Sequence, residues 1–293
     1  MPLSNFYSGD SRVPVRPPIL GAKDRRFNLE PNKDAGRIME REFINNPYPV
    51  LEVEADLKQV ANLKANMDRG AGLKHGFVLE RMVAKGINSQ SWFGPCATWS
   101  LAAEYDDIVN GIDGVLQLFK NVKKDYSVLA VAIDVTENGG GEKGKDIRAK
   151  LASIQAGLKS GELGKVKYFR PQRPNLQMKG EWRGVPKMVL VSTPSYTDRL
   201  VGQETGFNSH MMAMDFLIQL RIQAQVYAEY AKRQGNKKTA ETFLYIDREL
   251  QKIFNSKFAN SAFQSTGFAK NPNDFVLLKA LGDLGFNMES VKI

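Results

Sequence analysis

The strongest constraint on the fold is an almost unbroken apolar run at residues 128–135, with the sequence VLAVAIDV. Runs of this length that are rich in β-branched residues are typical of strands buried on both faces in the middle of a sheet. The only charged residue of the run, Asp134, lies near its end. A buried carboxylate costs free energy unless it is paired or bound to a metal. The run therefore predicts a central strand that holds an acidic group.

The segments around this strand predict an α/β fold, with a mixed central sheet flanked by helices and a helical C-terminal section. Residues 144–158 place apolar side chains along one helical stripe, and 165–170 and 187–193 have the character of strands. The dipeptide Asn110-Gly111 is favoured in two-residue hairpin turns, so it predicts antiparallel strands at 104–109 and 112–119. Helices are expected at 35–46, 51–69 and 77–87, and two long ones after residue 196.

These elements suggest four parts of the chain. Residues 1–34 contain closely spaced prolines and basic residues, which predict an extended or disordered arm. An N-terminal helical segment follows at 35–76, then the α/β core at 77–195 and the helical C-terminal section at 196–293. Whether the last section packs on the sheet is left open by the sequence.

A second acidic residue, Asp113, lies 21 positions before Asp134 on another predicted strand. Two carboxylates on neighbouring strands repel each other, and a divalent cation with oxygen ligands relieves that repulsion. Bound Mg²⁺ polarises a phosphoryl oxygen and lowers the pKa of a bound water. The pair therefore predicts a site for Mg²⁺ (or Mn²⁺), which the carbonyl of Val135 could complete. The alternative is that Asp134 only ends its strand and caps the glycine-rich turn after it.

This arrangement resembles the PD-(D/E)XK nuclease superfamily over about residues 77–195. The resemblance lies in an acidic residue on one strand, the motif Asp134-Val135-Thr136 at the end of a very apolar second strand, and the helix and strand that follow. It implies a restriction-endonuclease-like α-β-β-β-α-β core in which Asp113 and Asp134 bind the metal. It also implies Mg²⁺-dependent hydrolysis of phosphodiester bonds in DNA or RNA.

The lysine of the family motif is replaced here by Thr136. Some members carry that lysine on the following helix, which makes Lys150 its counterpart, with Lys143 and Lys145 as alternatives nearer the loop. The resemblance also implies a glutamate on the helix before the sheet, a position that Glu80 fills. If the lysine is lost rather than moved, the fold serves as a nucleic-acid-binding or assembly protein without catalysis.

The net charge points to nucleic acid as the partner. Lysine and arginine outnumber aspartate and glutamate by 41 to 32, and excess positive charge favours polyanions through counterion release. We expect nucleic acid, with DNA favoured over RNA, and leave self-association into a homo-oligomer open. The predicted phosphate-backbone contacts are Lys143, Lys145, Lys165, Lys167, Arg170 and Arg173.

A glycine-rich segment offers a different function. Residues 139–145 match the phosphate-binding loop G-x-x-x-x-G-K between a strand and a helix. The next position of that motif is Ser or Thr, whereas this chain has Asp146, whose negative charge repels phosphate. A nucleotide-binding protein is therefore the second alternative.

Cysteine content and hydropathy bound the location. A single cysteine excludes an intramolecular disulfide, and with two histidines it leaves too few ligands for a structural zinc site. The N-terminal residues lack the apolar region of a secretory signal, and the chain has no run of ~20 apolar residues. We therefore expect a cytoplasmic protein without a membrane partner.

Overall fold

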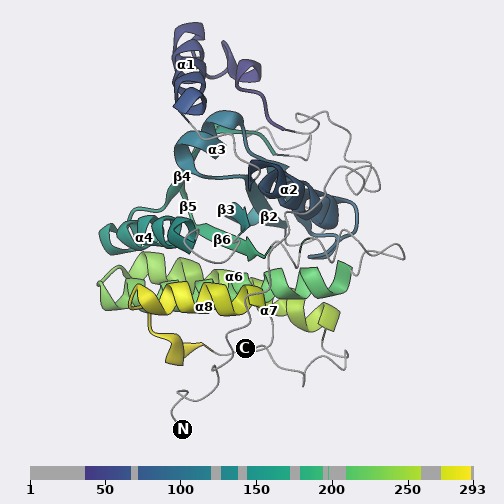
Figure 1. Cartoon of the computed structure of the whole chain (residues 1–293), viewed down its shortest axis with the longest axis vertical. Coiled ribbons are helices and arrows are strands. Elements are labelled where there is room, and N and C mark those ends of the chain that lie inside the picture. Colours follow the sequence, from purple (N-terminus) through teal and green to yellow (C-terminus); the bar gives the residue numbers. More distant parts are fainter. Residues whose placement is uncertain are drawn as a thin grey trace, which may run out of the picture.

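The computed structural model describes residues 37–66, 72–119, 127–137, 144–171, 179–193, 197, 209–258 and 272–291, which form an α/β fold (Figure 1). Its helices are α1 (Val50–Asn66), α2 (Gly72–Asn88), α3 (Glu104–Asn110), α4 (Gly144–Ser160), α6 (Ser209–Arg233), α7 (Lys237–Phe258) and α8 (Pro272–Asp283), with 3-10 turns η3 (Glu40–Phe43) and η6 (Met288–Ser290). Its strands are β1 (Ala97–Leu101), β2 (Gly114–Phe119), β3 (Ser127–Glu137), β4 (Gly164–Phe169), β5 (Gly180–Val185) and β6 (Lys187–Ser192).

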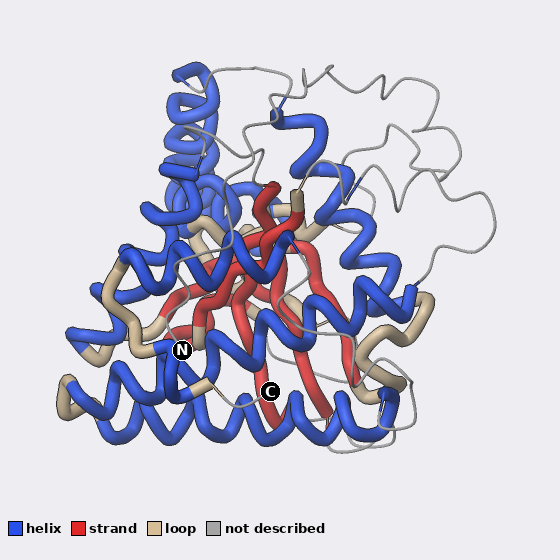
Figure 2. Tube along the Cα trace, turned by 60° about the horizontal axis from the view of Figure 1, so that its bottom comes forward, coloured by secondary structure: helices blue, strands red, loops and turns tan. Residues whose placement is uncertain are grey.

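The main sheet is mixed, as the sequence predicts. Its order is β1-β2-β3-β6. The pairs β1–β2 and β2–β3 are antiparallel, and β6 runs parallel to β3. Strands β4 and β5 form a separate antiparallel pair. The apolar run is confirmed as a central strand, because β3 lies between β2 and β6 and Val131, Ala132, Ile133 and Val135 are all buried. Helices surround the strands in the tube view (Figure 2).

The predicted hairpin around Asn110-Gly111 is wrong, because residues 104–110 form helix α3. Acidic side chains occupy the first turn of α3, where negative charge stabilises a helix N-terminus. Gly111 ends the helix in the left-handed conformation, with φ of 59°. Strand β2 therefore pairs with β1, which the sequence analysis missed. β1 is five residues long and is interrupted by Thr98 and Ser100, so its apolar signal is weak.

The helix predicted at 35–46 is also wrong in extent. Within the described part of that segment, only the single 3-10 turn η3 forms, and it is followed by Asn45 with φ of 59°. A left-handed non-glycine residue breaks helical continuity. The helices predicted at 51–69 and 77–87 are confirmed as α1 and α2, although α2 begins earlier, at Gly72.

The C-terminal helices pack on the sheet. Leu151 of α4, Phe216 and Leu217 of α6, and Leu281 of α8 belong to one buried cluster with Ile133 of β3. Two glutamines of α6 complete the hydrogen bonds of β6, the edge strand. Gln219 and Gln223 bond the N–H and C=O groups of Val191 and Val189 at 2.7–2.9 Å. The sheet edge is thereby covered by side-chain amides, one of the ways in which proteins protect strand edges.

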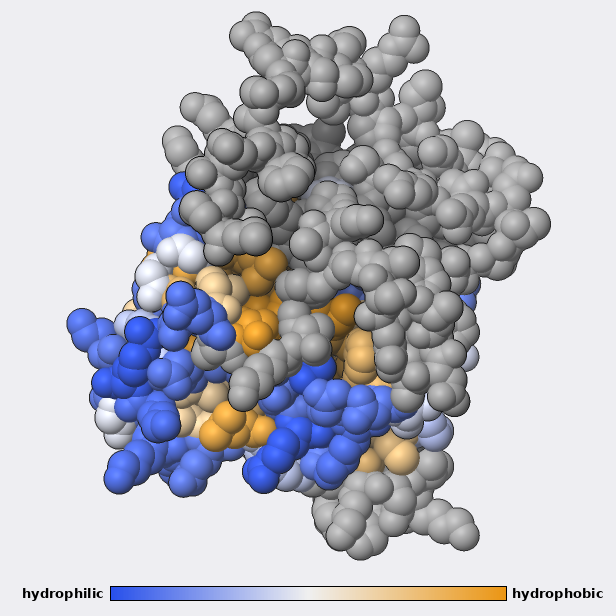
Figure 3. All heavy atoms as spheres, turned by 90° about the horizontal axis from the view of Figure 1, so that it is seen from below, coloured by the Kyte–Doolittle hydropathy of each residue, from blue (hydrophilic) through white to orange (hydrophobic). Residues whose placement is uncertain are grey.

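The outer surface of these helices is polar. In α7, Phe243, Ile246 and Leu250 point inward and are buried, while Glu241 and Arg248 are exposed. In the space-filling view from below, the coloured part of the surface has large hydrophilic regions with hydrophobic areas between them (Figure 3). Among the described helices, none combines the length and apolar character needed to cross a bilayer.

Candidate functional site

Asp113, in the turn just before β2, lies beside Asp134 of β3. Gly114 pairs with Ile133, and the backbone N–H of Asp113 donates to the carbonyl of Ile133 at 2.9 Å. The Asp113 carboxylate accepts a hydrogen bond of 2.5 Å from the N–H of Val135. Both side chains are buried. The register of β2 against β3 therefore brings the two predicted acidic residues to one place, although Asp113 belongs to the turn after α3 and not to the predicted hairpin.

Lys150 reaches the same place from α4. The buried stripe of this helix includes Ile147, Leu151 and Ile154, which fix the helix against the sheet. Lys150 flanks that stripe, and its Nζ donates to Oδ1 of Asp134 at 2.7 Å. An ammonium and a carboxylate in this geometry form a charge-assisted hydrogen bond. The lysine implied by the family resemblance is thus next to the second predicted carboxylate.

Glu80 of α2 adds a further acidic group near Asp113 and Asp134. Burial raises the pKa of Glu80 to about 7; the charges of Asp107 and Asp134 also raise it, against the opposing effect of Arg37. Burial raises the pKa of Asp113 well above its ordinary value, and Glu80, Asp134 and Asp107 add to that effect. We call Glu80, Asp107, Asp113 and Asp134 the carboxylate cluster.

Two basic residues that the sequence analysis missed belong to this site: Arg37 contacts the carboxylate cluster, and Lys187 lies near it. Arg37 lies 2.8 Å from Asp107 and 3.3 Å from Glu80, and it is joined to β1 by a bridge to Leu101. Its position in a segment predicted to be helical gave no sign of this role. Lys187 begins β6, which runs parallel to β3, and its Nζ donates to the carbonyl of Asn110 at 2.7 Å. Only knowledge of the strand order would have placed Lys187 opposite Ala132 of β3, two positions before Asp134.

The donor chemistry fits Mg²⁺. This ion usually takes one or two carboxylates, with waters and substrate phosphates as its other ligands. Asp113 and Asp134 supply hard oxygen donors, and Val135 follows Asp134 on β3. Among the described residues, no group of three or more His, Cys, Asp or Glu side chains is arranged to hold a metal. A metal here would therefore rely on two carboxylates rather than on a closed set of protein ligands.

The structure corrects the prediction that Lys167 contacts the phosphate backbone of a nucleic acid. Its ammonium lies 2.8 Å from Glu52 and 2.5 Å from Asp56, both on α1. It also lies over the rings of Tyr48 and Tyr105, 5.3 Å from each centroid. The side chain is buried, so it holds α1 against β4 and is not presented to a polyanion. The side chain is covered by α1, which is distant in sequence, so its local sequence context concealed this burial.

The other predicted contacts have different surroundings. Lys165 is exposed on β4, and its Nζ lies 3.7 Å from Glu181. Arg170 is exposed and pairs with Glu42 at 2.9 Å. Lys143 and Arg173 lie outside the described residues. Lys145 belongs to α4, but its side chain is also outside the described set, as are residues 138–143 of the glycine-rich loop.

Comparison with known proteins finds no matching family model, no matching curated protein and no matching solved structure.

Proposed function

We propose that the protein is a metal-dependent nuclease that hydrolyses phosphodiester bonds, with DNA favoured over RNA as substrate. The observation that carries this proposal is the meeting of Asp113, Asp134 and Lys150, which come from a turn, a strand and a helix. Two carboxylates and an ammonium at one place match the needs of a reaction that develops negative charge on phosphoryl oxygens.

The order of elements supports a restriction-endonuclease-like core. Helix α2 is followed by β1, β2 and β3, then by α4 and β6, an α-β-β-β-α-β succession. Helix α3 interrupts this succession between β1 and β2, and the pair β4–β5 is inserted between α4 and β6.

Each residue has a proposed chemical role. Asp113 and Asp134 hold Mg²⁺, which supplies Lewis acidity toward the phosphodiester. Lys150 is close enough to Asp134 to move between this carboxylate and an incoming phosphate, where its charge stabilises the transition state. The Val135 N–H fixes the orientation of Asp113. Glu80, with its raised pKa, accepts a proton near neutral pH.

A second candidate function is nucleic-acid binding without catalysis. Asp134 is paired with Lys150, and Asp113 accepts from Val135, so both carboxylates have internal partners. The family lysine position holds Thr136, which is buried. These contacts favour a stable scaffold, and this function predicts salt-sensitive binding that is indifferent to Mg²⁺.

Cleavage assays separate the two functions. The purified chain is incubated with labelled single- and double-stranded DNA and RNA in Mg²⁺ or Mn²⁺, beside Asp113→Ala and Asp134→Ala. The nuclease predicts cleavage by the wild type alone. Salt-sensitive binding without cleavage would support the scaffold, and undiminished cleavage by both variants would exclude the assigned site.

A further inference from the structure

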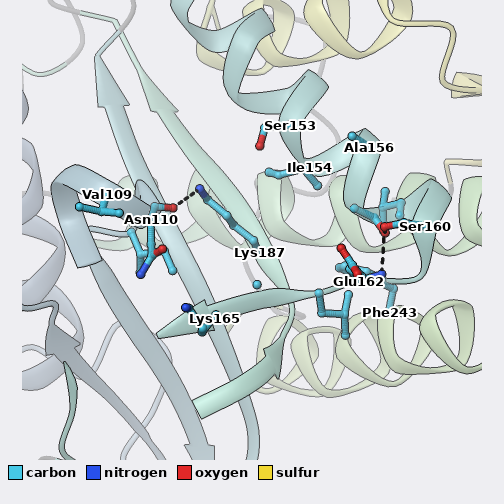
Figure 4. Close-up of a pocket in the computed structure, with 15 residues that line it drawn as sticks. Val109, Asn110, Ser153, Ile154, Ala156, Ser160, Glu162, Lys165, Lys187 and Phe243 are labelled. Atoms are coloured by element: carbon cyan, nitrogen blue, oxygen red, sulfur yellow. Dashed lines mark hydrogen bonds between the residues drawn. The ribbon is translucent and has the colours of Figure 1, made fainter. Parts of the chain in front are cut away.

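A cavity of about 570 Å³ lies between α4 and the ends of neighbouring elements (Figure 4). Ser153, Ile154 and Ala156 of α4 form one wall, and Asn110 at the end of α3 faces them across Lys187. Ligand pockets for small molecules typically have volumes of ~300–1,000 Å³. The space is therefore large enough for one nucleotide unit.

Lys187 connects this cavity to the carboxylate cluster. A Cβ atom built on Gly111 would lie 3.0 Å from Nζ of Lys187 and 3.6 Å from Oδ2 of Asp134. The ammonium is thus near the proposed metal ligand and also lines the cavity. A ligand in the cavity whose phosphate contacts Lys187 would therefore lie next to the proposed reaction centre.

The ammonium of Lys187 retains capacity for an anion. It carries three donors, and one goes to the carbonyl of Asn110. Among the described residues it forms no ion pair within 4.0 Å, in contrast with Lys150 and Lys167. Burial lowers the pKa of Lys187, against the opposing effect of Asp134. A half-buried cation without a carboxylate partner is stabilised by a bound anion.

Further groups on the cavity wall suit the rest of a nucleotide. Lys165 adds a second positive charge from β4. Leu163 and Val109, both partly exposed, supply apolar surface, against which a sugar or a base can pack. Glu162 provides a carboxylate that can accept a hydrogen bond from the amino group of a base. The wall thus combines positive charge, apolar surface and one acceptor.

We propose that this cavity binds one nucleotide of the substrate strand, next to the phosphodiester that is cleaved, with Lys187 contacting the phosphate of that nucleotide. This inference rests on the proposed nuclease function, because it assigns the cavity to the same strand. It makes Lys187 a binding residue, in a role separate from that of Lys150. The substrate strand would then be held at two places, by the metal at the reaction centre and by the cavity beside it.

Metal-free binding tests the cavity without any need for cleavage. Calorimetric titration in EDTA uses 5′-dAMP as the probe, with deoxyadenosine and inorganic phosphate in parallel. Lys187→Ala removes the proposed phosphate contact, and Ser153→Trp fills the cavity from the α4 wall without altering a charge. Lys159→Ala, on the exposed end of α4, is the matched control. Circular dichroism and thermal unfolding establish that each variant is folded.

We expect 5′-dAMP to bind the wild type and to lose at least tenfold in affinity in both Lys187→Ala and Ser153→Trp, with Lys159→Ala unchanged. Deoxyadenosine and phosphate alone should each bind more weakly than 5′-dAMP. The proposal is overturned if the wild type does not bind 5′-dAMP, if phosphate binds as tightly, or if neither variant weakens binding. If 5′-dAMP binds in this pattern but the wild type cleaves no substrate, the nuclease function fails while the binding site in the cavity stands.

Discussion

The ammonium of Lys150 lies 2.7 Å from a carboxylate oxygen of Asp134, which joins α4 to β3 at the centre of the proposed active site. Lys150 is 26% exposed and Asp134 only 4%. The lysine therefore has access to solvent and substrate, while the buried charge of the carboxylate depends on neighbouring groups for its stabilisation. We expect this pair to govern both stability and activity.

Replacing Lys150 by methionine should reduce the single-turnover rate of cleavage by at least ~100-fold, because charge stabilisation of the transition state is lost. It should also lower the free energy of unfolding by about 1–3 kcal/mol, since Asp134 loses a partner. Lys150→Arg should retain part of the rate, and Lys159→Met serves as the control on the same helix. A normal rate in Lys150→Met would show that Lys150 has no role in the reaction.

Magnesium should stabilise the folded protein through the two carboxylates. At a concentration 100 times the dissociation constant, a ligand that binds only the folded state adds about 2.7 kcal/mol. Thermal unfolding with increasing MgCl₂ should therefore raise Tm for the wild type, and much less for Asp113→Asn and Asp134→Asn. Asp283→Asn, on the surface beside Arg148, is the control. Equal shifts in all four proteins would place the ion elsewhere.

Stability without metal should fall as the pH rises toward neutrality. The pKa of Glu80 is raised by burial from its ordinary value of 4.5 to about 7, so the folded state binds more protons in that interval than the unfolded chain. The free energy of unfolding should be highest near pH 5 and decrease by roughly 2–3 kcal/mol on passing through pH 7. Urea unfolding in EDTA at several pH values measures this change.

Glu80→Gln should make that pH profile shallower and stabilise the protein at pH 8. A smaller dependence should remain, because the pKa of Asp113 is raised in the same direction. If Glu80→Gln has the same profile as the wild type, the carboxyl of Glu80 is not the group responsible.

The glutamines of α6 should contribute to stability independently of catalysis. Gln223 both donates to and accepts from the backbone of Val189, and both residues are fully buried. Gln223→Leu leaves buried N–H and C=O groups without partners, which costs about 1–3 kcal/mol each. Chemical unfolding should show a loss in that range, whereas Gln251→Leu on α7 should change little. Retention of wild-type stability would mean that β6 finds other partners.

Lys167 and Lys165 should respond in opposite ways to substitution. Lys167→Met leaves Asp56 and Glu52 facing each other without their cation, so we expect a loss of about 3–5 kcal/mol in the free energy of unfolding. Lys165→Met should leave stability nearly unchanged and weaken nucleic-acid binding. Unfolding curves and fluorescence anisotropy on a labelled oligonucleotide measure the two effects. Weaker binding by a stable Lys167→Met variant would restore Lys167 as a contact.

The sequence predicted the parts of the fold that have a strong local pattern of apolar residues. The apolar run of β3 and the stripe of Ile147, Leu151 and Ile154 on α4 depend on local pattern, and both elements are confirmed. The hairpin prediction failed because Asn110-Gly111 also suits the end of a helix, and only the pairing of β2 with β1 distinguishes the two. Turn dipeptides alone do not identify the elements they separate.

For the candidate site, the sequence predicted residues but not their environment. Asp113 and Asp134 were singled out by charge in an apolar context, and Lys150 by the family resemblance. The strand register and α4 bring the three residues together. Arg37 and Lys187 come from distant segments, so no local pattern connects them to the site. The burial of Lys167 depends on α1, which packs on β4 from more than a hundred positions away.

The central claim is tested most directly by the rate of cleavage of a labelled strand as Mg²⁺ is added, with wild type and Asp134→Asn compared at equal concentration. We predict cleavage that requires the metal, saturates with it, and falls by at least ~1,000-fold in the folded Asp134→Asn variant. Cleavage at the same rate in Asp134→Asn, or no cleavage of any DNA or RNA substrate by the wild type, would contradict the assignment of this site as a metal-dependent nuclease centre.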